Sequence, residues 1–81
     1  MNEQEVLTAL NPIFQDMFDD DDIELTPDTT AKDIEGWDSL AHVSLIVAAE
    51  QRFGVKFRTA ELDSLHNVGH FAQLISKKLN G

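Results

Sequence analysis

The stretch from Ser39 to Phe53, SLAHVSLIVAAEQRF, constrains the fold most, because as a helix it is apolar on two sides. Asp38 is a suitable N-cap for this helix and Gly54 a suitable residue to end it. At about 100° per residue, one face carries Leu45, Ile46, Ala49 and Phe53, and the roughly opposite face carries Leu40, Val43 and Val47. A helix of this kind is usually buried, but a chain of 81 residues can hardly surround it. We therefore expect one apolar stripe to face the core and the other to stay available to a partner.

The rest of the chain predicts a small helical domain. Three further helices are expected: Asn2–Phe18, kinked at Pro12; Ala60–Leu65, capped by Thr59; and Val68–Leu79, capped by Asn67. Residues 19–37 are rich in acids and turn-forming residues and predict a long loop. The expected fold is all-α, an antiparallel four-helix bundle of three main helices and one short helix with a long first loop. Residues 1–81 are expected to form a single domain.

The charge of the chain restricts its partners. The net charge is −9, from 15 acidic and 6 basic residues, and ten of the acids lie between Asp16 and Asp38. This balance argues against nucleic acid or an anionic membrane as a partner, and it favours a protein with a basic docking patch. No apolar run approaches the roughly 20 residues that span a bilayer. Since Met1 to Val6 contain no signal-peptide pattern, we expect a cytoplasmic protein.

Several kinds of chemical site are not predicted. The absence of cysteine excludes disulfides and thiolate metal sites. Counted from Asp19, the acidic run has Glu24 and Thr30 where an EF-hand loop needs Gly and Glu. His66 and His70 are four residues apart, but His66 precedes the predicted helix, so we predict no metal site. Ser39 with a histidine and an aspartate would lack an oxyanion hole, and we predict no catalytic residue and no enzyme.

The string Gly36-Trp37-Asp38-Ser39-Leu40 carries the main functional signal. Ser39 falls in the first turn of its helix, where free backbone N–H groups and the helix dipole favour a phosphate on the hydroxyl. Together with the apolar helix that follows and the later string Glu-Gln-Arg-Phe-Gly-Val-Lys-Phe, it resembles the acyl carrier proteins. The resemblance extends over nearly the whole chain.

The resemblance implies a covalent cofactor. In that family the serine of Asp-Ser-Leu receives 4′-phosphopantetheine from coenzyme A, and the terminal thiol holds an acyl group as a thioester. Ser39 would be the attachment residue. Asp63-Ser64-Leu65 repeats the tripeptide, but His66-Asn67-Val68-Gly69 interrupts any helix after it, so Ser39 is preferred.

The resemblance also assigns roles to the two faces of the helix. Leu40, Val43 and Val47 would touch partner enzymes, with Asp38 and Glu50 steering the encounter. Leu45, Ile46, Ala49, Phe53 and Phe71 would line a cavity for the acyl chain, with Phe14 as a further candidate. His42 would lie near its mouth, where either a partly exposed histidine with no special role or a pH-sensitive contact to cargo is conceivable.

The implied partners are a phosphopantetheinyl transferase and acyl-activating, acyltransferase and synthase enzymes with basic docking patches, acting on a monomeric carrier. Ala41 and Ser44 replace acids that carriers of general fatty-acid synthesis have on this helix. This favours a specialised free-standing carrier of fatty acid, polyketide or specialised lipid biosynthesis. Two alternatives remain open: a peptidyl or aminoacyl carrier of a nonribosomal pathway, and an unmodified helical adaptor.

Overall fold

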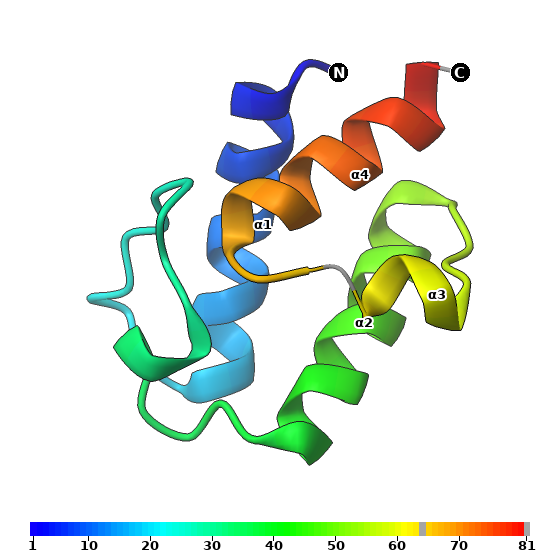
Figure 1. Cartoon of the computed structure of the whole chain (residues 1–81). Helices are drawn as coiled ribbons and strands as arrows, with labels where there is room; N and C mark the ends of the chain where they lie inside the picture. Colours follow the sequence, from blue (N-terminus) through cyan, green and yellow to red (C-terminus); the bar gives the residue numbers. More distant parts are fainter. Residues whose placement is uncertain (64, 81) are drawn as a thin grey trace.

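The fold is a small bundle of helices in the computed structural model, which describes residues 1–63 and 65–80. Within these residues there is no strand (Figure 1). The elements are α1 (Glu3–Phe18), the 3₁₀ turn η1 (Ala31–Asp33), α2 (Ser39–Phe53), α3 (Thr59–Leu62) and α4 (Val68–Asn80). The predicted all-α fold is confirmed, with three main helices, one short helix and a long connection between α1 and α2. No helix in the described part of the chain is long and apolar enough to cross a membrane.

Helix α1 is the centre of the packing. Asn2 caps it, since its side-chain oxygen accepts from the Glu5 N–H at 2.8 Å and its own N–H donates to the Glu5 carboxylate at 3.0 Å. The helix continues through Pro12 as a single element, as predicted. It contacts both α2 and α4. The largest fully buried side chains are Val6, Leu10, Phe14, Leu45, Val68 and Ile75. They come from all three main helices, so the core depends on their mutual packing.

Two side chains of α1 hold the long loop against the helix. The Asn11 amide donates to the Ile23 carbonyl at 3.1 Å and accepts from the Leu25 N–H at 2.7 Å. Gln15 donates to the carbonyls of Asp21 and Ile23 at 3.1 and 3.2 Å. Because these amides satisfy loop backbone groups, the acidic segment keeps a defined course without regular secondary structure.

The same loop caps helix α4. The N–H groups of Val68 and Gly69, at the start of α4, donate to the carbonyls of Thr29 and Pro27, each at 2.8 Å. The first N–H groups of a helix have no intrahelical acceptor, so these bonds join the loop to the end of the bundle. The 3₁₀ turn η1 follows directly and was not predicted from the sequence. Its signal was Thr30 and Asp33, three residues apart, whose backbone N–H and carboxylate are 2.9 Å apart.

We expect Gly69→Ala to destabilise the protein by about 1–3 kcal/mol. A Cβ at Gly69 would lie 2.6 Å from the Pro27 carbonyl oxygen, closer than such atoms pack. The loop would have to retreat and lose its bond to the Gly69 N–H. Urea unfolding measures the loss, with the exposed Gln73→Ala on the same helix as control. Equal stability of G69A and wild type would show that the contact between loop and helix is not needed.

Helix α3 differs from its prediction. It runs from Thr59 to Leu62 and not from Ala60 to Leu65, and Arg58 is its N-cap. The reason is the Glu61 carboxylate, which accepts from the Arg58 N–H at 2.8 Å and therefore starts the helix one residue early. The Lys78 ammonium, 2.9 Å from the same carboxylate, joins α3 to α4. The Arg58 backbone N–H and the Lys78 ammonium lower the pKa of Glu61.

Candidate functional site

The N-terminus of α2 is held by Asp38 and presents Ser39. The Asp38 carboxylate accepts from the Ala41 N–H at 2.8 Å, which confirms the predicted cap. Gly36 has a φ of +90°, a conformation that side chains disfavour, and it turns the loop into the helix. Ser39 is the first residue of α2, and its side chain is exposed. The hydroxyl is therefore accessible to a modifying enzyme.

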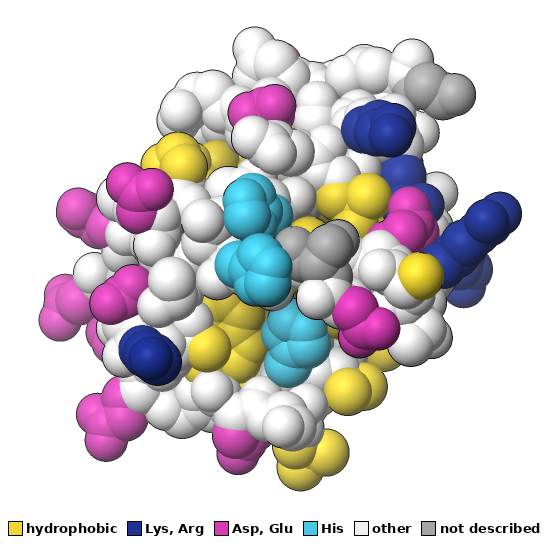
Figure 2. All heavy atoms as spheres, in the orientation of Figure 1, with side chains coloured by type: hydrophobic (Ala, Val, Ile, Leu, Met, Phe, Trp, Pro, Cys, Tyr) yellow, Lys and Arg dark blue, Asp and Glu magenta, His cyan; other side chains and the backbone are white. Residues whose placement is uncertain are grey.

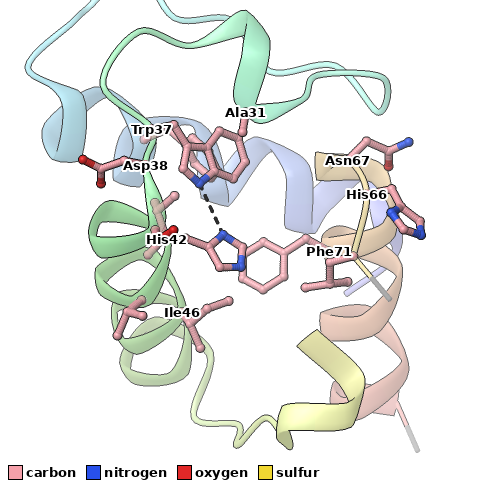
Figure 3. A pocket seen from close by; sticks show the side chains of 13 residues that line it. Ala31, Trp37, Asp38, His42, Ile46, His66, Asn67 and Phe71 are labelled. Atoms are coloured by element: carbon pink, nitrogen blue, oxygen red, sulfur yellow. Dashed lines mark hydrogen bonds between the residues drawn. The ribbon is translucent and has the colours of Figure 1, made fainter. Parts of the chain in front are cut away.

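Ser39 borders a largely apolar pocket of about 580 Å³ (Figure 3). Its lining comes from α1, the loop, α2, α4 and the segment before α4: Phe14, Ala31, Trp37, Asp38, Ser39, His42, Val43, Leu45, Ile46, Leu65, His66, Asn67 and Phe71. The exposed serine and the apolar walls thus belong to one hollow. A group attached to Ser39 lies at the opening of this hollow.

The pocket contains part of the predicted cavity lining. Leu45, Ile46 and Phe71 line it, as does Phe14. Ala49 and Phe53 are buried but do not line it. They lie about one and two turns beyond Leu45 and Ile46 on α2, farther from Ser39 than the pocket extends, and belong to the packed core.

Trp37 also lines the pocket, which was not predicted from the sequence. The indole Nε1–H donates to Nδ1 of His42 at 3.3 Å, and the two rings stack with 6.0 Å between centroids. Trp37 also meets Phe14 edge to face at 5.3 Å. The only available signal was a lone tryptophan two residues before Ser39. Figure 3 shows Trp37 and His42 on one side of the pocket, with His66 and Asn67 on the other.

The second apolar stripe of α2 is exposed. Leu40, Val43 and Val47 keep 78%, 60% and 45% of their surface in solvent. Val43 also lines the pocket, so the stripe and the pocket meet at this residue. The Glu50 carboxylate accepts from the Phe57 N–H at 3.0 Å and helps to position the chain after α2. Glu50 was predicted only to steer partners, and this bond was not predicted.

The surface charge is segregated. In Figure 2 acidic side chains gather over the loop after α1, basic side chains lie mostly on the other side, and histidines form a row between them beside an apolar patch. The His66 N–H donates to Nδ1 of His70 at 3.3 Å. No group of three or more metal-ligating side chains occurs among the described residues. Ser64, the alternative serine, lies outside the residues that the structure describes.

An exposed serine at a helix N-terminus beside an apolar pocket is an arrangement suited to a helical protein that carries a covalently attached group. The family described as "Phosphopantetheine attachment site" matches residues 9–75. The chain is 34% identical to an acyl carrier protein of Petrotoga mobilis, over 99% of this chain and 94% of that protein. It is 31% identical to one of Thermotoga maritima, over 96% of each chain.

A solved structure is also similar. The solution NMR structure of a holo acyl carrier protein from Geobacter metallireducens matches with a TM-score of 0.88 and 52% identity. The match covers 93% of this chain and 86% of that chain. The chain belongs to the acyl carrier protein family. It is a carrier protein rather than an enzyme, and its cofactor is covalently attached phosphopantetheine.

Proposed function

We propose that Ser39 is the residue that carries 4′-phosphopantetheine and that the acyl group it holds shelters in the adjoining pocket. The observation that supports this proposal most directly is that Ser39, the first residue of α2, is exposed and also borders the pocket. When bound, the cofactor supplies the thiol that this cysteine-free chain lacks.

The residues around Ser39 fit a phosphodiester. Asp38 and its carbonyl already occupy the N–H groups of Ala41 and His42. The N–H groups of Ser39 and Leu40 have no acceptor among the described residues. A helix N-terminus with free N–H groups favours a negative phosphate. In the transferase reaction the Ser39 oxygen would give up its proton and bond to the pantetheine-bearing phosphorus of coenzyme A. The bond from that phosphorus to the pyrophosphate oxygen would break, and adenosine 3′,5′-bisphosphate would leave. The helix N-terminus would then stabilise the negative charge of the phosphodiester.

Intact mass spectrometry tests this proposal. The protein is incubated with coenzyme A and a phosphopantetheinyl transferase of broad specificity, and one phosphopantetheine is expected to be added. Peptide mapping is expected to place the group on the peptide that contains Ser39 and not on the peptide that contains Ser64. Failure of the wild type to gain mass would overturn the proposal, because the serine hydroxyl is its whole chemical basis.

Partner enzymes are proposed to contact the exposed stripe Leu40, Val43 and Val47, with the charges of Asp38 and Glu50 aiding the encounter. Both carboxylates also accept backbone hydrogen bonds. Reversing either charge would therefore disturb local structure as well as docking. An apolar substitution on the stripe separates the two effects better.

We expect Leu40→Ala to reduce kcat/KM of the transferase roughly 5- to 30-fold, the effect of losing about 1–2 kcal/mol at an interface. Leu40 is 78% exposed, so truncation should leave the thermal midpoint of the carrier nearly unchanged. The steady-state rate is measured against carrier concentration, and Gln51→Ala, at another exposed position of α2, is the control. A rate equal to that of wild type would remove the stripe from the docking surface.

The pathway is proposed to be a specialised branch of fatty acid, polyketide or lipid biosynthesis. Ala41 and Ser44 leave the exposed part of α2 with few acids, which favours partners that recognise apolar contacts. One relative, 30% identical over 94% of this chain, is a meromycolate extension acyl carrier protein of Mycolicibacterium aurum.

The relatives' names support an acyl rather than a peptidyl cargo, and the phosphopantetheine family match gives the unmodified adaptor no support. The single domain, the monomeric state and the cytoplasmic location stay predictions.

A further inference from the structure

The bond between Trp37 and His42 selects one tautomer of the neutral imidazole. The indole nitrogen can only donate, so Nδ1 of His42, at 3.3 Å from it, is the acceptor. A neutral imidazole has one acceptor and one donor nitrogen. The hydrogen therefore lies on Nε2, and this assignment follows from the hydrogen-bond network.

The Nε2–H group of His42 has no acceptor among the described residues. His42 is half-buried and lines the pocket, whose neighbouring walls are the apolar side chains of Phe14, Ile46 and Phe71. Figure 3 shows the second ring nitrogen on the side of the imidazole that faces Phe71. A donor in an apolar wall is stabilised by an acceptor, and water or a ligand must supply it.

The position of His42 relates this donor to the attachment residue. Ser39 and His42 are three residues apart on α2, so they share a face of the helix. Both line the same pocket. The arm on Ser39 is longer than the one helical turn to His42, so it has to fold back for the acyl group to enter the pocket beside these two residues. An acyl chain that enters there has its carboxyl end near the imidazole and its tail toward Leu45 and Phe71.

We propose that His42 is a specificity-determining residue that favours acyl groups with an oxygen near the carboxyl end over plain hydrocarbon chains. The Nε2–H donates to that oxygen, and Trp37 holds the ring in the tautomer that makes this possible. The inference rests on the proposed attachment at Ser39. It assigns to His42 a contact with cargo that depends on hydrogen bonding and not on charge.

The test compares two chains of equal length. Wild-type carrier is loaded with octanoyl or 3-hydroxyoctanoyl groups from the corresponding coenzyme A thioesters, at about pH 8, where histidine is ordinarily neutral. Hydroxylamine cleaves the thioester, and the cleavage rate of each acyl-carrier is measured. The cleavage rate of the free S-acyl pantetheine with the same acyl group is then divided by this rate. This gives a protection factor for each chain. One hydrogen bond of ordinary net strength is expected to make the factor about 2- to 10-fold larger for the hydroxylated chain.

Three variants separate the hydrogen bond from simple packing. His42→Phe keeps an aromatic ring but no donor, and is expected to give equal protection factors for the two chains. His42→Gln has both a donor and an acceptor, and is expected to retain part of the preference. His70→Phe changes a histidine of α4 that does not line the pocket and is expected to behave as wild type. In ¹H–¹⁵N spectra, the resonance of the Trp37 indole N–H is expected to differ between the octanoyl and 3-hydroxyoctanoyl forms when residue 42 accepts a hydrogen bond from the indole. In H42F, which has no acceptor, the resonance is expected to be the same in both forms.

The outcomes are distinguishable. Loading confirmed by mass with equal protection factors in the wild type would overturn the role of His42 and leave the proposed function intact. An equal loss of preference in H42F and H70F would assign the effect to a general change of the fold, and it would likewise contradict the inference. Absence of any mass gain would overturn the attachment proposal, and this inference would fall with it.

Discussion

Ser39→Ala is expected to abolish the addition of phosphopantetheine completely. Alanine has no oxygen with which to form the phosphodiester, and no other described serine occupies the first turn of a long helix beside the pocket. Ser39 is exposed, so the variant should fold like wild type. The measurement is intact mass after incubation with coenzyme A and transferase, with circular dichroism to confirm folding.

Matched controls make the result specific. Ser44→Ala removes another exposed hydroxyl of α2, five residues further along the helix, and should leave the mass gain unchanged. Ser64→Ala removes the serine of the second Asp-Ser-Leu and should do the same. Modification that persists in S39A and disappears in S64A would reverse the assignment.

Phe14→Ala is expected to be the most destabilising single substitution proposed, at about 3–5 kcal/mol. Phe14 is fully buried, lies against Phe18 and Trp37, and forms part of the pocket wall. Its removal would leave a cavity between α1 and the start of α2. Domains of this kind are stable by only about 5–15 kcal/mol, so the variant should unfold at much lower urea concentration.

The control for Phe14 is a phenylalanine that is less buried. Phe57 is half-buried and contacts Phe71 at 5.5 Å between ring centroids. Phe57→Ala should cost no more than about 2 kcal/mol. Tryptophan fluorescence should report the difference a second time, since only the change at Phe14 removes a neighbour of Trp37. Equal losses of unfolding free energy in F14A and F57A would show that burial does not determine how much each phenylalanine contributes to stability.

Much of the helical structure followed from local patterns. The helix Ser39–Phe53 has the predicted bounds because its cap, its apolar repeat and its terminal glycine are all close together in the sequence. Helix α3 was placed wrongly because its start depends on a bond between Glu61 and the backbone of Arg58, which competes with Thr59 as a cap. The turn η1 was missed for the same kind of reason, since bonds between Thr30 and Asp33 define it: the Asp33 N–H donates to the Thr30 carbonyl, and the Thr30 N–H donates to the Asp33 carboxylate.

The sequence by itself determined the class of protein, the candidate serine and the two apolar faces of α2. These depend on residues within a few turns of one another, and helix geometry relates them directly. Only the tertiary structure decided how far the pocket extends, that Trp37 and His42 form one of its sides, and that Ala49 and Phe53 lie outside it. It also decided the course of the acidic loop, which Asn11 and the start of α4 hold in place. These features arise between segments far apart in the chain, and their positions are set by packing that no local pattern encodes.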